Sequence, residues 1–416
     1  MDAMTTVDTN GKTVAADALG ATIAAPSSGS TLSPTTTLKA TTRPAVLPRA
    51  QGSELVHEDS ERYAKKKVLG AGGMGEVVLA EDRDIGRNVA MKYLNAPHDA
   101  SALARFVDEI RIVGSLEHPN IVPIHDVGVD DSSRYYFVMK HVEGETLEGI
   151  IEKLQAGDAA YQNKYTFTAR AEIFMALLRA LEFAHANGYV HRDIKPANVM
   201  VGRYGEVMLM DWGVAKRRRA PEETGGEVAA DDPSKSIKER LFTTRRGAIV
   251  GTPAYMSPEQ ARGEIEKIDE RSDVYCASAL FYELMTLCHY LGEQTTLPAL
   301  LSAIQTQPAP EAHKPLVHPA QGVAPAEYLH FAHRGLEKDP AARFQSVGEM
   351  IELLQATLDG RVKVQCPVTL TKRFTRELGR FTDRHPRIAM TSFFGGTLAL
   401  VALVAWSIFA AIRLHG

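Results

Sequence analysis

The sequence predicts an α+β protein in which a small β-rich lobe precedes a larger helical lobe, followed by one C-terminal transmembrane helix. Three observations support this fold class. Short β-type runs such as Val77-Val78-Leu79 and Tyr136-Phe137-Val138 fall within residues 61–142. Residues 143–357 show mainly helical periodicity. Residues 388–412 are apolar and contain no charged side chain.

The overall composition indicates a globular protein and excludes some classes of function. The 416 residues are 44% hydrophobic, which is enough for a sizeable core. A formal net charge of -4 gives no basic footprint for nucleic acid, so we expect no nucleic-acid partner. Cys276, Cys288 and Cys366 are widely spaced and form neither a disulfide framework nor a metal-ligand pattern. This favours a reducing compartment, and the N-terminus shows no secretory signal.

Residues 1–55 are dominated by Thr, Ala, Ser and Pro and have no helical or strand period. Such a segment buries too little apolar surface to offset the entropy lost on folding. We therefore expect a disordered N-terminal tail.

A glycine-rich loop lies between two predicted strands near the start of the globular region. It reads LGAGGMGEVVLA, and Gly70, Gly72 and Gly75 allow the backbone to turn tightly and approach a phosphate. A dinucleotide-binding fold would need a helix directly after the glycines, whereas here VVLA continues as a strand. Lys92 ends the next apolar run and could direct a cation towards an anion under the loop. The alternative is an ordinary exposed strand lysine.

Two helices are predicted around the most polar part of the sequence. The segment SALARFVDEIRIVGSL predicts a helix with Ser101 as its N-cap and Phe106 in its apolar stripe. Glu109 lies beside that stripe, where its carboxylate either orients Lys92 or is simply solvated. The second helix, in AEIFMALLRALEFAHANG, ends at Asn187-Gly188 and leads into HRDIKPANVM.

The remaining segments are a long polar stretch and an apolar C-terminal run. Residues 217–246 are rich in both signs of charge, and we expect a mobile loop. Residues 388–412 are long enough to cross the hydrocarbon core of a bilayer, with a buried core helix as the alternative. The juxtamembrane segment 358–387 is basic and only residues 413–416 follow the span, so the positive-inside rule places the main domain in the cytoplasm. The basic residues before the span are Lys372, Arg373, Arg376, Arg380, Arg384 and Arg387.

Five motifs occur in the order and spacing of the protein-kinase signature set. They are GAGGMGEV, VAMK, HRDIKPAN, the Asp211-Trp212-Gly213 triplet and GTPAYMSPE. Residues 61–357 therefore resemble a two-lobed protein kinase, with an N-lobe at 61–142 and a C-lobe at 143–357. The glycine loop and the predicted anchor are most similar to bacterial membrane-anchored serine/threonine kinases of the eukaryotic-like, Hanks type. This resemblance implies a single-pass protein of a bacterial inner membrane that takes part in signalling.

The resemblance implies catalytic roles around HRDIKPAN. Asp193 would accept or orient the proton of the substrate hydroxyl, and Asn198 and Asp211 would bind Mg²⁺. Lys195 resembles the lysine with which serine/threonine kinases neutralise charge on the transferred phosphoryl group. Thr252 resembles the threonine that shapes the site for a Ser or Thr hydroxyl. The expected reaction is transfer of the ATP γ-phosphoryl group to Ser or Thr of proteins.

The resemblance also implies an ATP site between the lobes. Lys92 would hold the α- and β-phosphates, and Glu109 would hold Lys92. Met139 resembles the gatekeeper residue, and the backbone from Lys140 to Val142 resembles the hinge that hydrogen-bonds adenine. The complete implied set is Leu69, Gly70, Ala71, Gly72, Gly73, Met74, Gly75, Glu76, Val77, Ala90, Lys92, Glu109, Met139, Lys140 and Val142.

Several further matches concern structure and regulation. Glu259 and Arg343 resemble a buried ion pair of the large lobe, and Asp273 resembles the aspartate that braces the catalytic loop. Trp212 replaces the usual Phe of the metal-binding triplet and is still able to pack against His191.

Regulation by phosphorylation follows from the same resemblance. Arg192 precedes the catalytic aspartate, an arrangement in which a phosphate of the activation segment often pairs with the arginine. Thr243 and Thr244 are the candidate acceptors, with autophosphorylation as the expected route. Gly395 and Gly396 would allow close helix packing and hence a homodimer.

Two other classes of function remain open. A pseudokinase would use the same fold as a scaffold without catalysis. The presence of Lys92, Asp193 and Asn198 argues against it. A small-molecule kinase is the other alternative, and GTPAYMSPE, which resembles a peptide-docking loop, argues for protein substrates instead.

Overall fold

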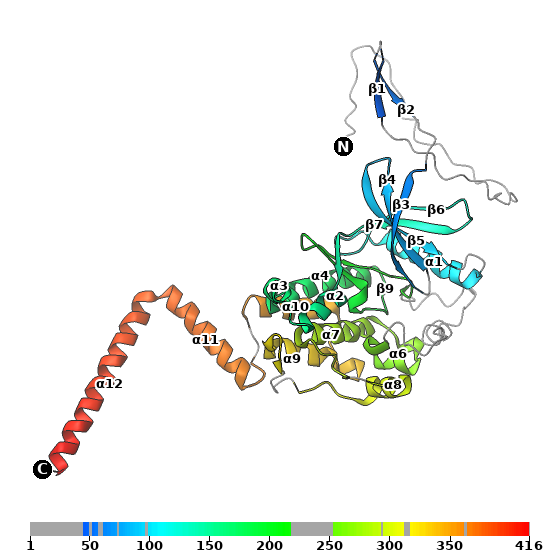
Figure 1. Cartoon of the computed structure of the whole chain (residues 1–416). Helices are drawn as coiled ribbons and strands as arrows, with labels where there is room; N and C mark the ends of the chain where they lie inside the picture. Colours follow the sequence, from blue (N-terminus) through cyan, green and yellow to red (C-terminus); the bar gives the residue numbers. More distant parts are fainter. Residues whose placement is uncertain are drawn as a thin grey trace, which may run out of the picture. The chain divides into compact units, whose positions relative to one another are not determined.

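The computed structural model of the chain describes residues 45–49, 52–56, 61–72, 75–95, 99–217, 253–292, 294–311, 317–361 and 364–415 (Figure 1). Five site residues named above lie outside these ranges: Gly73, Met74, Thr243, Thr244 and Thr252. Residues 1–44 of the predicted tail and 218–246 of the predicted loop also lie outside them, as do residues 247–252.

Two short strands occur within the region that composition assigned to a disordered tail. Strand β1 (Ala45–Arg49) pairs antiparallel with β2 (Gly52–Val56). The composition did not predict this two-stranded ribbon. A segment rich in Thr and Ser is expected to lack a hydrophobic core, but its composition does not indicate whether neighbouring backbone segments pair.

The small lobe contains the predicted sheet, which has five antiparallel strands in the order β3-β4-β5-β7-β6. Alternate residues of β5 point to opposite faces. Val89, Met91 and Tyr93 join a buried cluster on one face, so Ala90 and Lys92 lie on the other. The strands are β3 (Tyr63–Ala71), β4 (Gly75–Asp82), β5 (Arg87–Leu94), β6 (Ile124–Val129) and β7 (Tyr135–Lys140).

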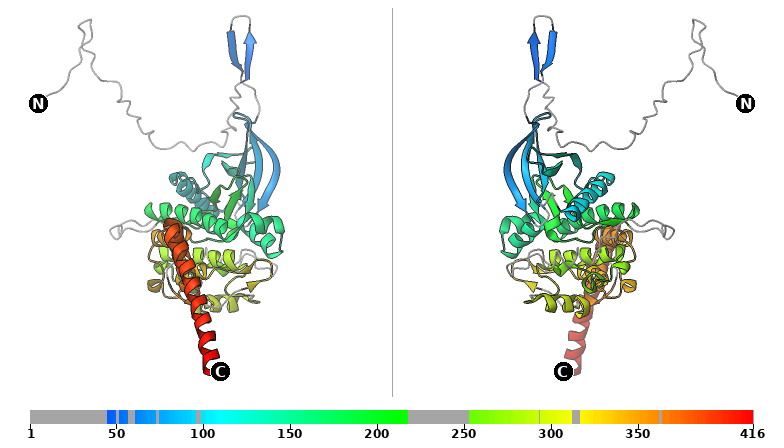
Figure 2. Two further views of the ribbon diagram at one scale, coloured as in Figure 1. Left: turned by 90° about the vertical axis from the view of Figure 1, so that its left-hand side faces the viewer. Right: turned by 90° about the vertical axis from the view of Figure 1, so that its right-hand side faces the viewer.

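Helix α1 (Ala100–Ser115) lies against the sheet (Figure 2). Its Phe106 forms a buried cluster with Leu94 and Phe137. The predicted N-cap at Ser101 is wrong. The side chain of Asp99 accepts hydrogen bonds from the backbone N–H groups of Ser101 and Ala102 and is therefore the cap. A carboxylate two residues upstream satisfies these free amides, and its charge suits the positive end of the helix dipole.

The large lobe is helical, as the sequence predicts, and its core forms around α4 and α7. The rings of Phe174 and Phe281 lie 4.4 Å apart between these two helices. Helix α9 approaches α7 very closely, because a Cβ on Gly335 would lie 1.8 Å from Ser278 Oγ. The α-helices are α2 (Leu147–Gln155), α3 (Ala159–Lys164), α4 (Phe167–Ala186), α6 (Pro258–Arg262), α7 (Glu270–Thr286), α8 (Leu297–Thr306), α9 (Ala326–Gly335) and α10 (Val347–Leu358).

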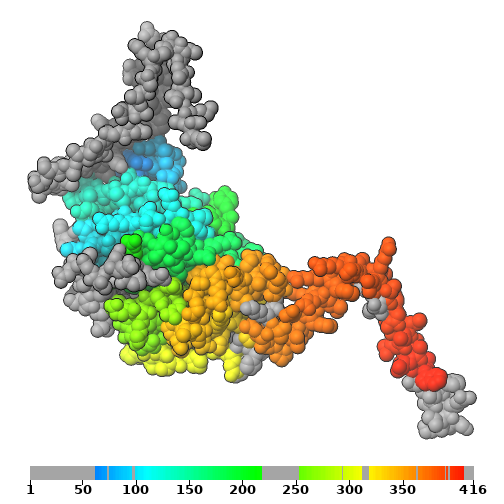
Figure 3. Space-filling model, turned by 180° about the vertical axis from the view of Figure 1, so that it is seen from behind, coloured from blue at the N-terminus to red at the C-terminus, as the bar shows by residue number. Residues whose placement is uncertain are grey.

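Helix α4 ends at the predicted position, with Asn187 as its C-cap and Gly188 at a positive φ of 80°. Glycine adopts this left-handed conformation without the Cβ clash of other residues. Helix α10 packs against α4. Figure 3, which views the molecule from behind, shows this part of the surface of the large lobe.

Short strands and 3₁₀ turns frame the segment that follows α4. Strand β9 pairs with β12, and β10 pairs with both β8 and β11. The strands of the large lobe are β8 (Gly144–Thr146), β9 (Tyr189–Val190), β10 (Val199–Gly202), β11 (Val207–Leu209), β12 (Lys216–Arg217), β13 (Val317–His318) and β14 (Gly322–Val323). The 3₁₀ turns are η1 (Pro196–Asn198), η2 (Pro253–Tyr255), η3 (Ile265–Lys267) and η4 (Pro340–Ala342).

Two helices follow the large lobe, α11 (Pro367–Arg384) and α12 (Pro386–His415). They are separate because Pro386 lacks the N–H that would continue α11, so a new helix begins there. The segment 388–412, predicted to cross a membrane, lies within α12. Among the residues that the structure describes, no helix combines the length and the apolar character needed to span a bilayer, so the predicted transmembrane helix is not supported.

Candidate active site

Lys92 is held between two carboxylates that come from different parts of the chain. Its Nζ lies 2.6 Å from Glu109 Oε1 on α1 and 3.4 Å from Asp211 Oδ1, which follows β11. The side chain of Lys92 is 12% exposed and that of Glu109 is 5% exposed. This geometry excludes both alternatives that the sequence left open, the exposed strand lysine and the solvated helix glutamate.

The electrostatics of this group keep Lys92 charged. Burial disfavours the ammonium form, but the carboxylates of Asp211 and Glu109 outweigh burial and raise the pKa of Lys92. A fixed cation on the inner face of the sheet is suited to bind phosphate oxygens.

Three of the predicted catalytic residues meet in the loop after β9. Lys195 Nζ donates a hydrogen bond of 2.9 Å to Asp193 Oδ2. The Asn198 amide nitrogen donates to the backbone oxygen of Asp193 at 2.8 Å and to its Oδ2 at 3.2 Å. The 3₁₀ turn η1, which begins with Pro196, brings Asn198 back over Asp193. A carboxylate with a lysine beside it can receive a proton while the lysine faces developing negative charge.

The residues predicted to bind metal lie beside two paired strands and offer oxygen ligands: Asn198 directly precedes β10, and Asp211 follows β11. The backbone N–H of Met210 donates to the Asn198 carbonyl oxygen at 2.9 Å, so β10 and the residues after β11 run together here. Asn198 uses its amide nitrogen on Asp193, which leaves its side-chain oxygen for a cation. Asp211 has a positive φ of 56°, an unusual backbone conformation for this residue type. Carboxylate and amide oxygens suit Mg²⁺, which takes its other ligands from phosphate and water.

No cluster of three or more His, Cys, Asp or Glu side chains that could hold a metal occurs among the described residues.

Asp273 on α7 fixes the start of the catalytic loop. Its two carboxylate oxygens accept the backbone N–H groups of His191 and Arg192, each at 2.8 Å. His185 Nε2 lies 2.8 Å from the same carboxylate. Burial favours the neutral acid, but these hydrogen bonds outweigh it and hold the pKa of Asp273 low. The anion in turn supports Arg192 in a left-handed conformation with a φ of 69°.

The expected contact between His191 and Trp212 is present. The two rings lie 4.5 Å apart at 64°, and both side chains are fully buried. His191 Nδ1 accepts the Asp193 N–H, while Nε2 lies 3.2 Å from the Met210 carbonyl oxygen. Burial lowers the pKa of His191, so the ring is neutral and can use one nitrogen as acceptor and the other as donor.

The glycine loop connects β3 to β4 as predicted, but its glycines serve different purposes. A Cβ on Gly75 would lie 2.1 Å from the Tyr93 carbonyl oxygen, so glycine is required there by packing. Gly70 and Gly72 face open space. Residues Leu69 to Gly72 are exposed.

The predicted adenine contacts lie where β5 and β7 pair. Ala90 stands opposite Met139, the predicted gatekeeper, and Val142 is buried. The Lys140 N–H donates to the Pro123 carbonyl oxygen at 3.1 Å. The N–H of Lys140 is therefore already used and is not available for a hydrogen bond to a base.

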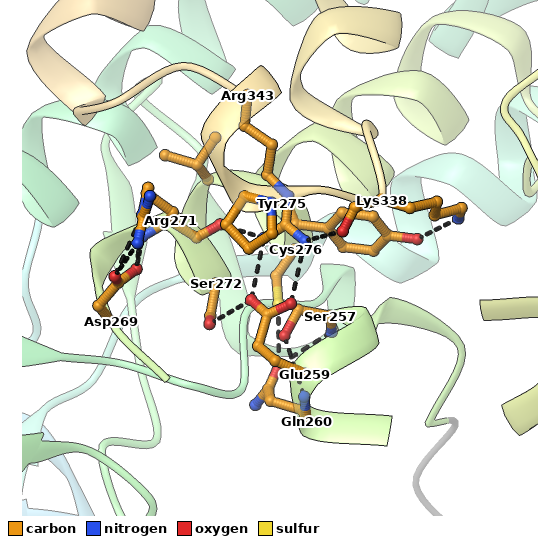
Figure 4. Close-up of polar contacts among 12 residues, drawn as sticks. Ser257, Glu259, Gln260, Asp269, Arg271, Ser272, Tyr275, Cys276, Lys338 and Arg343 are labelled. Carbon is orange, nitrogen blue, oxygen red and sulfur yellow. Dashed lines mark hydrogen bonds and ion pairs between the residues drawn. The ribbon is translucent and has the colours of Figure 1, made fainter. Parts of the chain in front are cut away.

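The predicted ion pair between Glu259 and Arg343 is buried and bidentate (Figure 4). Two nitrogens of Arg343 lie 2.9 Å from the two oxygens of Glu259, and Ser272 Oγ donates to Glu259 at 2.6 Å. Burial opposes ionisation of Glu259, but the hydrogen bonds from Arg343 outweigh it and lower its pKa.

Gln260 is a functional neighbour that sequence reasoning missed. Its side-chain oxygen accepts the Ser257 N–H, and Ser257 caps α6 in return. Its amide nitrogen donates to the Arg192 carbonyl oxygen at 2.8 Å, which ties α6 to the catalytic loop. The signal was present as the capping-box pattern Ser-x-x-Gln, which predicts the helix start but not the distant contact.

A second missed feature is an acidic cavity beside the catalytic loop, with a volume of about 350 Å³. Its walls include Pro196 and Tyr255, and Tyr255 donates a hydrogen bond to Glu283. Glu148 and Glu152 of α2 also line the cavity. Burial raises the pKa of Glu283. A cation bound in the cavity would lower that pKa again, because it favours the charged carboxylate.

A family model and several curated proteins match most of this chain. The family model described as a protein kinase domain matches residues 63–355. A Streptomyces coelicolor protein named "Probable serine/threonine-protein kinase" is 36% identical over 337 residues, covering 80% of this chain and 45% of that protein. The serine/threonine-protein kinase PknD of Protochlamydia amoebophila is 33% identical over 321 residues, covering 76% of this chain and 32% of that protein. PknB of Mycolicibacterium smegmatis is 35% identical over 296 residues, covering 70% and 42%. This chain thus spans less than half the length of these relatives.

Proposed function

The chain belongs to the protein kinase family, and on that premise we propose that it transfers the γ-phosphoryl group of ATP to serine or threonine hydroxyls of proteins. The observation that carries the proposal is the cluster of Asp193, Lys195 and Asn198, in which the two side-chain nitrogens lie 2.9 Å and 3.2 Å from Asp193 Oδ2. The names of the similar bacterial proteins support the Ser/Thr class.

In the proposed reaction, the substrate hydroxyl oxygen forms a bond to the γ-phosphorus while the bond to the β-phosphate oxygen breaks and ADP leaves. Asp193 orients the hydroxyl and receives its proton. Lys195 faces the charge that develops on the transferred group, and Lys92 holds the other phosphates. Asn198 and Asp211 would hold Mg²⁺, which neutralises phosphate charge when bound.

The test is transfer of labelled phosphate from ATP and Mg²⁺ to a generic basic protein, with Asp193→Asn beside the unaltered chain. We expect label on Ser and Thr that falls by about 10² or more in the variant. ATP binding is measured in parallel. Binding without any transfer by the unaltered chain would favour the scaffold interpretation, and label on Tyr would contradict the Ser/Thr assignment.

We also propose that the acidic cavity selects substrates with a basic residue near the acceptor. Glu148, Glu152 and Glu283 give it three carboxylates next to Pro196, which follows Lys195. A guanidinium is the group that best matches clustered carboxylates. Two substrate peptides that differ only in having Arg or Ala near the acceptor test this. The chain should phosphorylate the Arg peptide about tenfold more efficiently, and Glu283→Gln should reduce this preference. An unchanged preference would contradict this assignment.

The predicted phosphorylation of Thr243 or Thr244, and the role of Thr252, concern residues outside the described ranges and stay predictions. What supports a phosphate partner is Arg192, whose Nε is buried and has no hydrogen-bond partner among the described residues. Phosphopeptide mapping after incubation with ATP tests autophosphorylation. Full activity with neither threonine modified would exclude a role for them.

We further propose that the C-terminal segment attaches the chain to a membrane. Residues 388–412 carry no charged side chain, and the large apolar side chains of α12 whose burial the structure describes are at least half exposed, from Val404 at 50% to Leu398 at 74%. Apolar surface of this extent is stable in lipid and not in water. Gly395 and Gly396 would allow two such helices to pair. Flotation of the full chain with vesicles tests attachment, and Gly395→Leu with Gly396→Leu tests pairing, which should weaken.

A further inference from the structure

Helix α11 has a continuous apolar stripe on its exposed surface. Leu370, Phe374, Leu378 and Phe381 follow one another at spacings of four, four and three residues, so they share one helical face. Their exposure ranges from 46% for Phe381 to 65% for Phe374. Four large apolar side chains in a row are more than scattered surface residues and indicate a contact surface.

The other side of α11 already has its partners in the large lobe. Thr369 is buried, and Lys372 Nζ lies 2.8 Å from Glu327 Oε2 on α9. Arg380 donates a hydrogen bond of 2.8 Å to the Asp359 carbonyl oxygen at the end of α10. On a helical wheel, residues 369, 372 and 380 lie opposite residues 374 and 378. The apolar stripe therefore points away from these contacts.

The charge beside the stripe indicates which partner covers it. Residues 367–387 contain six basic residues against Glu377 and Asp383, in a chain whose net charge is -4. A second copy of α11 would bring two cationic helices together, which is unfavourable. A bilayer with anionic headgroups matches both the apolar stripe and the flanking cations. Of the six basic residues, Lys372 and Arg380 contact the large lobe and Arg376 lies on that same face, whereas Arg373 and Arg384 lie beside the stripe and Arg387 follows in α12.

We propose that α11 lies along the surface of an anionic bilayer, with its apolar stripe among the acyl chains and with Arg373 and Arg384, which border the stripe, at the lipid phosphates. This inference rests on the proposed membrane attachment of the C-terminal segment. It assigns to α11 a role separate from that of α12. The negative charge of the lipid decides whether α11 binds the membrane surface, and the part of the large lobe that contacts α11 is then held near the membrane.

The experiment uses tryptophan fluorescence of the full chain with vesicles whose acyl chains are brominated and quench buried tryptophan. Trp406 on α12 reports membrane attachment in the unaltered chain, and Trp212 is fully buried in the large lobe. The α11 reporter is Phe374→Trp in a Trp406→Phe background. Its matched control is Gly379→Trp in the same background, because Gly379 lies on the opposite face of α11 and a side chain there meets open space.

We expect quenching of Phe374→Trp to be about threefold stronger with phosphatidylglycerol in the vesicles than with phosphatidylcholine alone. Gly379→Trp should show little quenching in either, and added salt should remove the difference. Replacing Arg373 and Arg384, the two arginines beside the stripe, by Gln in the reporter background should also remove it.

Three results would overturn the proposal. Quenched Trp406 with no difference between Phe374→Trp and Gly379→Trp would leave membrane attachment standing and exclude the α11 surface. If neither Trp406 in the unaltered chain nor Phe374→Trp were quenched in any vesicle, both the membrane attachment and the α11 surface would be excluded. A blue shift of Phe374→Trp that grows with protein concentration without lipid would assign the stripe to a second copy. Phosphoryl transfer, measured on the same samples, reports on the proposed function separately.

Discussion

Lys92 gains its role from contacts that meet only in the folded chain. Strand β5 supplies the lysine, α1 supplies Glu109, and the segment after β11 supplies Asp211. The same residue therefore links the sheet of the small lobe to the segment of the large lobe that carries Asp211, which we propose as a metal ligand. Its positive charge depends on both carboxylates, since burial alone would lower its pKa.

Replacing Lys92 by Met should reduce phosphoryl transfer by about 10² or more, because the cation that binds the phosphates is lost. The change also removes the ammonium from beside the buried Glu109, and we expect the free energy of unfolding to fall by about 1–3 kcal/mol. Labelled-phosphate transfer and urea unfolding measure the two effects.

Lys66→Met is the matched control for Lys92→Met, because the Lys66 side chain on β3 is 43% exposed and pairs with the equally exposed Glu81. It should change the unfolding free energy by no more than about 0.5 kcal/mol. Full activity of Lys92→Met would contradict the proposed phosphate contact.

The ion pair of Glu259 and Arg343 predicts a pH dependence of stability. The pKa of Glu259 is lowered in the folded state, so its ionised form stabilises the fold above the unfolded value of about 4.3. That stabilisation is lost as the pH falls through the lower folded pKa. Arg343→Met should cost about 3–5 kcal/mol at pH 7, because it leaves the buried carboxylate without its partner.

For the same pair, the difference in unfolding free energy between the unaltered chain and Glu259→Gln should shrink as the pH falls below about 4.3. Denaturant unfolding at several pH values measures this. A difference that stays constant down to acid pH would show that ionisation of Glu259 does not contribute.

At the scale of elements, α7 positions much of the site without touching a substrate. Its Asp273 holds the catalytic loop, its Ser272 supports the Glu259 and Arg343 pair, and its Glu283 accepts a hydrogen bond from Tyr255. The helix is buried along most of its length, which keeps these three contacts in fixed relation.

The strands β4 and β5 give a prediction for the glycine loop. Gly75→Ala should destabilise the small lobe by about 1–3 kcal/mol, because its Cβ would lie 2.1 Å from the backbone oxygen of Tyr93, which cannot move without breaking the sheet. Gly72→Ala is the matched control, since its Cβ meets open space. Thermal unfolding of Gly75→Ala and Gly72→Ala tests this prediction. Equal stability of the two variants would contradict the packing requirement at Gly75.

At the scale of the whole molecule, the ATP site uses residues of both lobes, so a bound nucleotide should stabilise the chain. ATP with Mg²⁺ at about 100 times its dissociation constant should add about 2.7 kcal/mol to the unfolding free energy. Removal of Mg²⁺ with a chelator should reduce this gain, because the phosphates then lose the metal that Asn198 and Asp211 hold. Thermal unfolding with ATP, in the presence and absence of a chelator, measures this gain. In Asp211→Asn, the stabilisation by ATP should not depend on Mg²⁺.

Much of the site could be predicted from the sequence, because the residues that perform the chemistry lie within short motifs. Asp193, Lys195 and Asn198 stand within six consecutive residues, so their spacing alone indicated a shared role. The end of α4 at Gly188 was equally local, since it depends on one backbone conformation. The N-cap of α1 was missed because Asp99 and Ser101 are both good caps, and the choice depends on backbone geometry.

The sequence by itself determined the order of the two lobes, the residues of the catalytic loop and the apolar character of the C-terminal run. Only the tertiary structure decided that Glu109 pairs with Lys92, that Gln260 holds the Arg192 carbonyl, and that α11 keeps an apolar stripe exposed. The physical reason is that these features depend on burial and on contacts between residues far apart in the chain. A local pattern records which groups are present, whereas packing selects which of them meet.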